Sequence, residues 1–267
     1  MTTVSEHEVA KAATRLSQAA SGREPCAPVR DLIGPENVEA AYAVQESLTK
    51  AALASGRRLV GRKIGLTAVS VQRQLGVDQP DYGMLFDDMD VPNGGDIPFG
   101  ALLQPKCEAE IAFILGGDLD TDRLTSADVL SSIEWAVAAI EVVDSRIAGW
   151  DITIADTIAD NASSGRFVLG HELRRLNQID LVACGMALEK RGEVVSTGAG
   201  VACLGSPLNA VLGLARTMAR IGRPLRRGDV VLSGALGPMV AAAPGDRFLA
   251  RVEGLGSVSV GFEGAPQ

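Results

Sequence analysis

Three glutamates in two apolar segments are the residues whose type and spacing best suit metal chemistry. Glu108 and Glu110 stand two apart in the segment 105–115, Pro-Lys-Cys-Glu-Ala-Glu-Ile-Ala-Phe-Ile-Leu. Side chains alternate between the two faces of a strand, so both carboxylates are predicted to share one face. Buried like charges persist only when they are protonated, paired or bound to a cation, and Mg²⁺ or Mn²⁺ prefers such oxygen ligands. The alternative is a solvated strand face that carries two charges.

A third carboxylate, Glu141, lies in another apolar and β-branched segment, 138–143. A glutamate in such a segment needs a partner. A metal shared with the first two glutamates would provide one, and it would leave coordination sites for water and a chelating anionic substrate. The alternative partner is an arginine, with Arg62 and Arg146 as the candidates.

A lysine and an aspartate are candidates for proton transfer. Lys63 stands between Gly61 and Gly65 in a predicted strand, where the glycines leave room for a ligand to approach the backbone. A lysine beside a metal-bound anion can orient it or move a proton, and the alternative is a surface lysine on an edge strand. Asp81 lies in the predicted turn 79–83 and is a candidate base or water-positioning group, with an ordinary Asx turn as the alternative.

Two stretches of small and polar residues are candidates for substrate binding. The segment 156–165 contains Ser163 and precedes a predicted strand, as loops that line sites often do, although it also suits a helix cap. A Gly-rich stretch that begins with Ser233 and Gly234 follows another predicted strand, and its backbone amides suit a carboxylate. This stretch lacks the lysine and the spacing of phosphate-binding and dinucleotide-binding loops.

Composition limits the classes of protein to which the chain can belong. Its 267 residues suit one large domain or a core with a small appended part, and its net charge of −8 argues against nucleic acid or an anionic membrane as partner. Four dispersed cysteines predict buried thiols in a reducing, cytoplasmic compartment. Two histidines disfavour a histidine-based zinc site and a Ser-His-Asp triad. No segment is typical of a signal peptide or a membrane span.

The predicted elements fall into two parts, helical over residues 1–58 and largely β over residues 59–267. A capping box of Ser5 and Glu8 begins the first helix, and Pro35 marks the start of the second. Further helices are predicted at 126–136 and 207–221, and the predicted strands are 59–66, 108–115, 138–143, 166–169, 182–189, 229–233 and 247–262. Strand and helix do not alternate regularly, so we expect an α+β fold with a rolled mixed β-structure and peripheral helices.

Several segments resemble the 2-hydroxypenta-2,4-dienoate hydratases of aromatic meta-cleavage pathways, which are also called 2-keto-4-pentenoate hydratases. The similarity runs from about residue 35 to 262 through the segments 61–67, 74–83, 104–112, 141–147, 156–163 and 232–238. The family belongs to the fumarylacetoacetase-like superfamily, whose core is a rolled mixed β-sheet. The resemblance implies metal-ligating acids at Glu108, Glu110 and Glu141, an active-site lysine at Lys63 and an acidic residue at Asp81.

The resemblance also implies an activity and partners. The enzyme would add water to 2-hydroxypenta-2,4-dienoate, or a substituted relative, whose 2-oxygen and carboxylate chelate Mg²⁺ or Mn²⁺. We expect substrate contacts from Ser163, Ser233 and Gly234, a homo-oligomer that is pentamer-based, and association with the downstream aldolase. No histidine lies near the motifs, which disfavours the C–C bond hydrolysis of other superfamily members. Two alternatives stay open. One is a 4-oxalocrotonate-type decarboxylase with the same three acids, and the other is a non-catalytic partner subunit.

Overall fold

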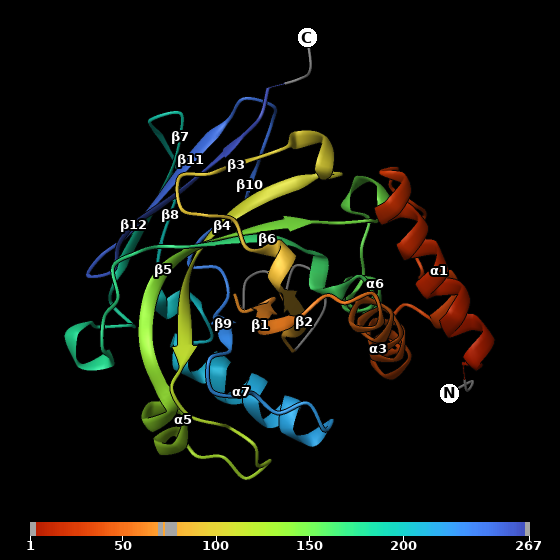
Figure 1. Ribbon diagram of the computed structural model, residues 1–267, viewed down its shortest axis with the longest axis horizontal. Coiled ribbons are helices and arrows are strands. Elements are labelled where there is room, and N and C mark those ends of the chain that lie inside the picture. The colour runs from red at the N-terminus through yellow and green to blue at the C-terminus, as the bar shows by residue number, and fades with distance from the viewer. Residues whose placement is uncertain (1–3, 69–71, 73–78, 265–267) are drawn as a thin grey trace.

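The computed structural model describes residues 4–68, 72 and 79–264, and residues 74–78 of one family-like segment lie outside them. A strongly curved sheet forms the centre of the molecule (Figure 1). Helices α1, α3 and α6 lie on one side of it, and a second, smaller sheet lies at the opposite end. The predicted rolled, mixed α+β architecture is confirmed.

The larger sheet has seven strands in the order β2-β1-β9-β4-β5-β6, with β10 paired to β4 outside this path. β1 runs parallel to β9, whereas β4 is antiparallel to β9, β5 and β10, so the sheet is mixed. The long strands β4 and β5 are apolar and buried along most of their length, which places them at the centre of the core. The bounds are β1 Leu59–Gly65, β2 Asp81–Phe86, β4 Pro105–Leu115, β5 Ile133–Asp144, β6 Ser164–Leu169, β9 Val230–Leu232 and β10 Val240–Ala241.

The smaller sheet has five strands in the order β3-β12-β11-β7-β8. Its strands β11 and β12 pack against β4 and β5, and one hydrophobic cluster joins the two sheets. The bounds are β3 Asp96–Ile97, β7 Gly185–Lys190, β8 Glu193–Ala199, β11 Arg247–Val252 and β12 Gly256–Phe262.

The helices begin at recognisable capping residues. The predicted capping box is present, because Ser5 accepts a hydrogen bond from the Glu8 amide and the Glu8 carboxylate accepts one from the Ser5 amide. α1 and α3 share a hydrophobic cluster with α6, separate from the cluster of the sheets. The bounds are α1 Glu6–Gly22, α2 Arg30–Ile33, α3 Val38–Ala54, α5 Ser126–Ser132, α6 Ile154–Ala159 and α7 Pro207–Arg220. The division of the chain at residue 58 stays a prediction.

Several predicted boundaries were wrong where pairing between distant segments outweighed local pattern. The predicted helix 126–136 ends at Ser132, because residues 133–137 pair with the far end of β4. Asp81 begins strand β2 rather than standing in a turn. The predicted strand 247–262 is a hairpin, and the exposed strand β8 was not predicted.

Three of the four cysteines agree with the expectation of buried thiols. Cys107, Cys184 and Cys203 are buried free thiols, and Cys26 is a half-buried one. Within the described part of the chain, no helix is long and apolar enough to cross a membrane.

Candidate active site

The pairing of β4 with β5 brings the three predicted glutamates together. Glu108 stands directly opposite Glu141 in this antiparallel pair, and Glu110 stands on the same face one pleat further along β4. One carboxylate oxygen from each residue can be chosen so that all three lie within 4.8 Å of one another. The predicted common face of Glu108 and Glu110 is therefore confirmed; Glu110 is buried on it, and Glu108 is half-buried.

The environment of these carboxylates suits a divalent cation. Glu110 and Glu141 are buried; Glu110 Oε1 and Glu141 Oε2 have no partner among the described residues, and Glu141 Oε1 has only the ion pair with Lys63 that is described below. Burial, followed by repulsion from Glu141, raises the pKa of Glu108 to about 7, and burial raises the pKa of Glu110 and Glu141 as well. Burying several carboxylates with free oxygens costs free energy, which a cation with hard oxygen ligands would offset. The donor set therefore fits Mg²⁺ or Mn²⁺.

The Gly-rich stretch after β9 holds one of the glutamates in place. The amide of Gly234 donates a hydrogen bond of 2.9 Å to Glu110 Oε2, which leaves Oε1 free on the other side. Gly234 has a φ of +105°, and a side chain there would lie 2.4 Å from Thr67. The substrate contact expected of Gly234 stays a prediction, and in the structure its amide donates to a carboxylate of the protein itself.

Lys63 is the charge partner of Glu141. Its Nζ lies 3.2 Å from Glu141 Oε1, and both side chains are buried. Burial alone would lower the pKa of Lys63, but the charges of Glu141 and the neighbouring carboxylates raise it overall, so the amine is protonated. β1 lies between β2 and β9, so the alternative of a surface lysine on an edge strand was wrong. The arginines considered as partners of Glu141 lie elsewhere: Arg146 pairs with Asp160, and Arg62 donates to its neighbour Gly61.

Asp81 faces the same region from the adjacent strand. It pairs with Gly65 of β1, where an added side chain would lie 2.2 Å from Asp81 Oδ1 and 3.3 Å from Lys63 Nζ. The Asp81 carboxylate and the Lys63 amine therefore both lie next to Gly65, which has no side chain. Asp81 Oδ2 accepts a hydrogen bond of 2.9 Å from Thr157, whereas Oδ1 has no hydrogen-bond donor among the described residues. Burial raises the pKa of Asp81, and Lys63 and Thr157 oppose this rise.

The two predicted serines are buried, but they differ in their contacts. Ser163 Oγ donates to Asp160 Oδ2 at 3.5 Å, so its hydroxyl is engaged within its own turn. Ser233 Oγ is fully buried and has no hydrogen-bond partner in the described part of the chain. The carbonyl of Ser233 accepts a bond of 2.7 Å from the thiol of Cys203. Ser233 thus has a hydroxyl available for a ligand, whereas Ser163 has a structural contact.

Two supporting residues have roles other than those considered from the sequence, in which Asn161 was only a candidate helix cap. Thr157 orients Asp81, as described above. Asn161 binds both backbone groups of Met84, accepting from its amide at 2.7 Å and donating to its carbonyl at 3.0 Å, which fixes the turn after α6 to β2. That turn has positive φ angles at Asn161, Ala162 and Ser163, a backbone conformation that non-glycine residues adopt at a cost of about 1–3 kcal/mol each in strained sites. Only the polar, small-residue composition of 156–165 pointed to it.

Comparison with known proteins shows which protein family the chain is similar to. Residues 63–262 match the model of the fumarylacetoacetate hydrolase C-terminal family. The chain is 62% identical to the TodF product hydratase of Pseudomonas putida, with 95% of each chain covered. It is 55% identical to a 2-keto-4-pentenoate hydratase of Paraburkholderia xenovorans, with 95% of this chain and 94% of that one covered.

A solved structure extends the comparison to three dimensions. The 4-oxalocrotonate decarboxylase from Pseudomonas putida G7, complexed with magnesium and adipate, superposes with a TM-score of 0.93 at 35% identity and covers 98% of this chain and 100% of that one. A second structure of that decarboxylase contains calcium and acetate.

Proposed function

The chain belongs to the fumarylacetoacetate hydrolase C-terminal family and, within it, to the 2-keto-4-pentenoate hydratases, and on this premise we propose how its residues carry out the hydration. It is a hydro-lyase of meta-cleavage catabolism that acts on 2-hydroxypenta-2,4-dienoate or a substituted homologue. The observation that carries the proposal is the group of three carboxylates, two of them buried with oxygens that accept no hydrogen bond from the described residues, beside the buried amine of Lys63.

In our proposal Glu108, Glu110 and Glu141 hold a divalent cation, Mg²⁺ or Mn²⁺. Once bound, the cation supplies Lewis-acid stabilisation of negative charge on the substrate's 2-oxygen and carboxylate. Gly234 keeps Glu110 oriented through its amide. Ser233 offers its free hydroxyl to the substrate, and Ser163 acts by fixing the turn in which it lies.

Lys63 and Asp81 carry out the proton transfers in this proposal. Hydration requires loss of the proton from the 2-hydroxyl, delivery of a proton to C5, addition of water oxygen at C4 and delivery of a proton to C3. Lys63 carries a proton and a positive charge beside Glu141, so it orients the anionic substrate and donates. Asp81 has one unbonded oxygen, Oδ1, with which it accepts the proton of the attacking water. Such general acid–base steps contribute about 10²–10⁴-fold to a rate.

Isotope incorporation tests the reaction itself. Turnover in H₂¹⁸O should place the label at C4 of 4-hydroxy-2-oxopentanoate as a hydroxyl that does not wash out, and turnover in D₂O should place deuterium at C5. Mass spectrometry and proton NMR of the product check both positions. A decarboxylase would instead release CO₂ from 4-oxalocrotonate and leave C4 unlabelled, and a non-catalytic subunit would do neither.

Replacing Thr157 with valine should shift the pH profile of the enzyme. Burial raises the pKa of Asp81 and the Thr157 hydroxyl lowers it, so removal of the hydroxyl should raise this pKa further. The acidic limb of the kcat/KM profile should then move to higher pH. The value near neutrality should fall at least about tenfold, because a hydrogen bond to a charged group contributes about 1.5–3 kcal/mol. Steady-state kinetics across pH measure both effects.

Thr49→Val is the matched control for this prediction. Thr49 is also a buried threonine, but its hydroxyl donates to Gln45 within α3, away from Asp81. Its pH profile should stay that of the wild type. A Thr157→Val profile that coincides with the wild-type one would show that ionised Asp81 takes no part in the rate-limiting step.

The remaining expectations on assembly and location are also part of the proposal. The family resemblance supports a homo-oligomer, pentamer-based, that associates with the downstream aldolase, and analytical ultracentrifugation with and without that aldolase tests both. The four free cysteines support a cytoplasmic location.

A further inference from the structure

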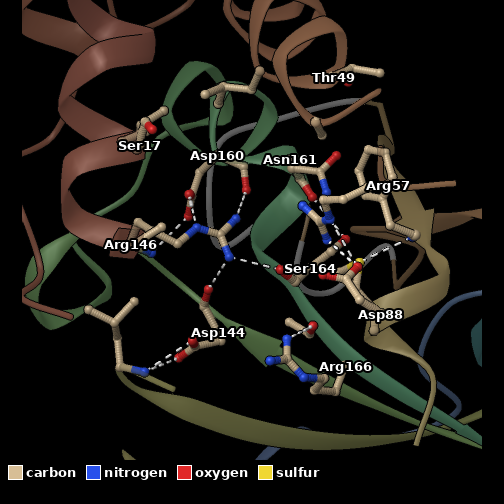
Figure 2. A pocket seen from close by; sticks show the side chains of 18 of the residues that line it. Ser17, Thr49, Arg57, Asp88, Asp144, Arg146, Asp160, Asn161, Ser164 and Arg166 are labelled. Atoms are coloured by element: carbon tan, nitrogen blue, oxygen red, sulfur yellow. Dashed lines mark hydrogen bonds and ion pairs between the residues drawn. The ribbon is translucent and has the colours of Figure 1, made fainter. Parts of the chain in front are cut away.

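A second cavity lies apart from the carboxylate site. It has a volume of about 530 Å³ and lies between helices α1 and α3 on one side and β2, β6 and the turn after α6 on the other (Figure 2). None of the three glutamates lines it, nor do Lys63 and Asp81. Its volume is within the range of about 300–1,000 Å³ that is typical of small-molecule sites.

The polar wall of this cavity carries more positive than negative charge. Four arginines line it against three aspartates, in a chain whose net charge is −8. The seven residues are Arg23, Arg57, Arg146, Arg166, Asp88, Asp144 and Asp160.

Each of the three aspartates already has hydrogen-bond donors. Asp160 pairs with Arg146, whose guanidinium also donates to three backbone carbonyls (Figure 2). Asp88 pairs with Arg57 at 2.6 Å. Asp144 accepts hydrogen bonds from the amides of residues 103 and 104. The carboxylates of the wall are therefore engaged without Arg166 or Arg23.

Arg166 is the half-buried arginine of the wall that forms no salt bridge with a described residue. Its Nη1 donates to the carbonyl of Gly165 at 2.9 Å, and no carboxylate of the described residues lies within salt-bridge distance. The side chain is half-buried, and this burial lowers the pKa of Arg166. The charges of Asp88 and Asp144 oppose the shift, whereas those of Arg57 and Arg23 add to it. A desolvated guanidinium with spare donors is best matched by a carboxylate, which it can bind through two parallel hydrogen bonds.

The opposite wall carries apolar side chains among the polar Ser17, Gln45, Thr49 and Ser55. α1 and α3 supply Leu16, Leu48 and the small side chains of Ala20, Ala51 and Ala52. Phe86, Met89 and Leu102 continue this surface at the base. A ligand that fits both walls has an anionic head and a hydrocarbon body.

We propose that this cavity binds a small organic monocarboxylate, with its carboxylate on Arg166 and its hydrocarbon chain against α1 and α3. The excess of one positive charge in the wall matches a single carboxylate. Arg23, whose guanidinium donates to the carbonyl of Gly100, adds positive charge at the exposed rim. The cavity is distinct from the metal-chelating site, so the proposal does not rest on the assigned reaction.

Calorimetric titration of the Mg²⁺-loaded enzyme with hexanoate tests this proposal, and inorganic phosphate serves as a second probe. Hexanoate should bind, and phosphate should bind at least about tenfold more weakly because it has no hydrocarbon chain. Hexanoate affinity should persist in Glu110→Gln, which lacks the chelating site, and should fall at least about tenfold in Arg166→Gln. Arg251→Gln is the matched control, because Arg251 pairs with Glu189 in the smaller sheet, and it should bind as the wild type does.

Ala51→Glu gives a second test that does not remove a structural arginine. Ala51 is an exposed helix residue that lines the cavity, so a glutamate there should leave the fold intact and repel the carboxylate. Three results would overturn the proposal: hexanoate binding that is lost in Glu110→Gln but kept in Arg166→Gln, phosphate binding as tightly as hexanoate, or no hexanoate binding at millimolar concentration.

Discussion

Exchanging Glu110 for glutamine should lower kcat/KM by more than about a hundredfold and abolish saturable Mn²⁺ binding. Glu110 is fully buried and directs one unbonded oxygen toward the other two glutamates. The glutamine oxygen can still accept the Gly234 amide, so the substitution removes a charged ligand and keeps the local shape. Loss of a group that only supports a metal ligand already costs about 10–100-fold, so loss of a ligand should cost more.

Stability measurements separate a missing ligand from a damaged fold in this variant. Burial and the charges of Glu141 and Glu108 raise the pKa of Glu110, so its ionised form is disfavoured in the metal-free protein. In the presence of a chelator, Glu110→Gln should therefore have a free energy of unfolding at least equal to that of the wild type. Added Mn²⁺ should stabilise only the wild type.

Glu193→Gln is the matched control for the loss of a strand glutamate. Glu193 is exposed at the start of β8, and its variant should keep wild-type kinetics and metal affinity. Wild-type Mn²⁺ affinity in Glu110→Gln, measured by calorimetry, would refute the site of three carboxylates.

Replacing Lys63 with methionine should separate catalysis from metal binding. Methionine keeps most of the volume of the buried stem but removes the charge that lies 3.2 Å from Glu141. We expect kcat/KM to fall at least about tenfold, equivalent to about 1.4 kcal/mol of lost transition-state stabilisation. Metal affinity should be kept or increased, because one positive charge beside the cation is gone. Steady-state kinetics and metal titration on the same preparation measure the two effects.

Lys190→Met provides the comparison for Lys63→Met. Lys190 is also a strand lysine in an ion pair, at 2.8 Å from Asp246, but it lies in the smaller sheet. Its variant should keep both activity and metal affinity. Activity within about twofold of the wild type in Lys63→Met would mean that the buried amine only balances the charge of Glu141.

Local sequence pattern determined the part of the site that lies on single strands. The period of two along a strand is a local property, so the common face of Glu108 and Glu110 followed from their spacing. The apolar context of Glu141 likewise predicted that this acid is buried and needs a partner. The irregular order of strands and helices predicted a rolled mixed β-structure, and the family resemblance agreed with it and added the hydratase activity; both are supported by the comparisons.

The tertiary structure decided which residues face one another across strands. The partner of Glu141 is Lys63, whereas the sequence analysis considered only two arginines as side-chain partners. Lys63 lies on β1 and Glu141 on β5, and these strands are separated in the sheet by β9 and β4. The position of Asp81 depends on the pairing of β2 with β1, not on the turn-like residues around it. The position of Arg166 in the second cavity could not be predicted from the sequence either, because it also depends on contacts between distant segments.

The sequence by itself therefore determined the chemical type of the site, and the fold determined its geometry. Residue type and strand periodicity depend on neighbours a few positions apart, which a single sequence displays directly. Strand order and register depend on which apolar faces pack together across the whole chain, and a shift of one residue would reverse the face of every side chain. The meeting of Lys63 with Glu141, and of Thr157 with Asp81, follows from that packing alone.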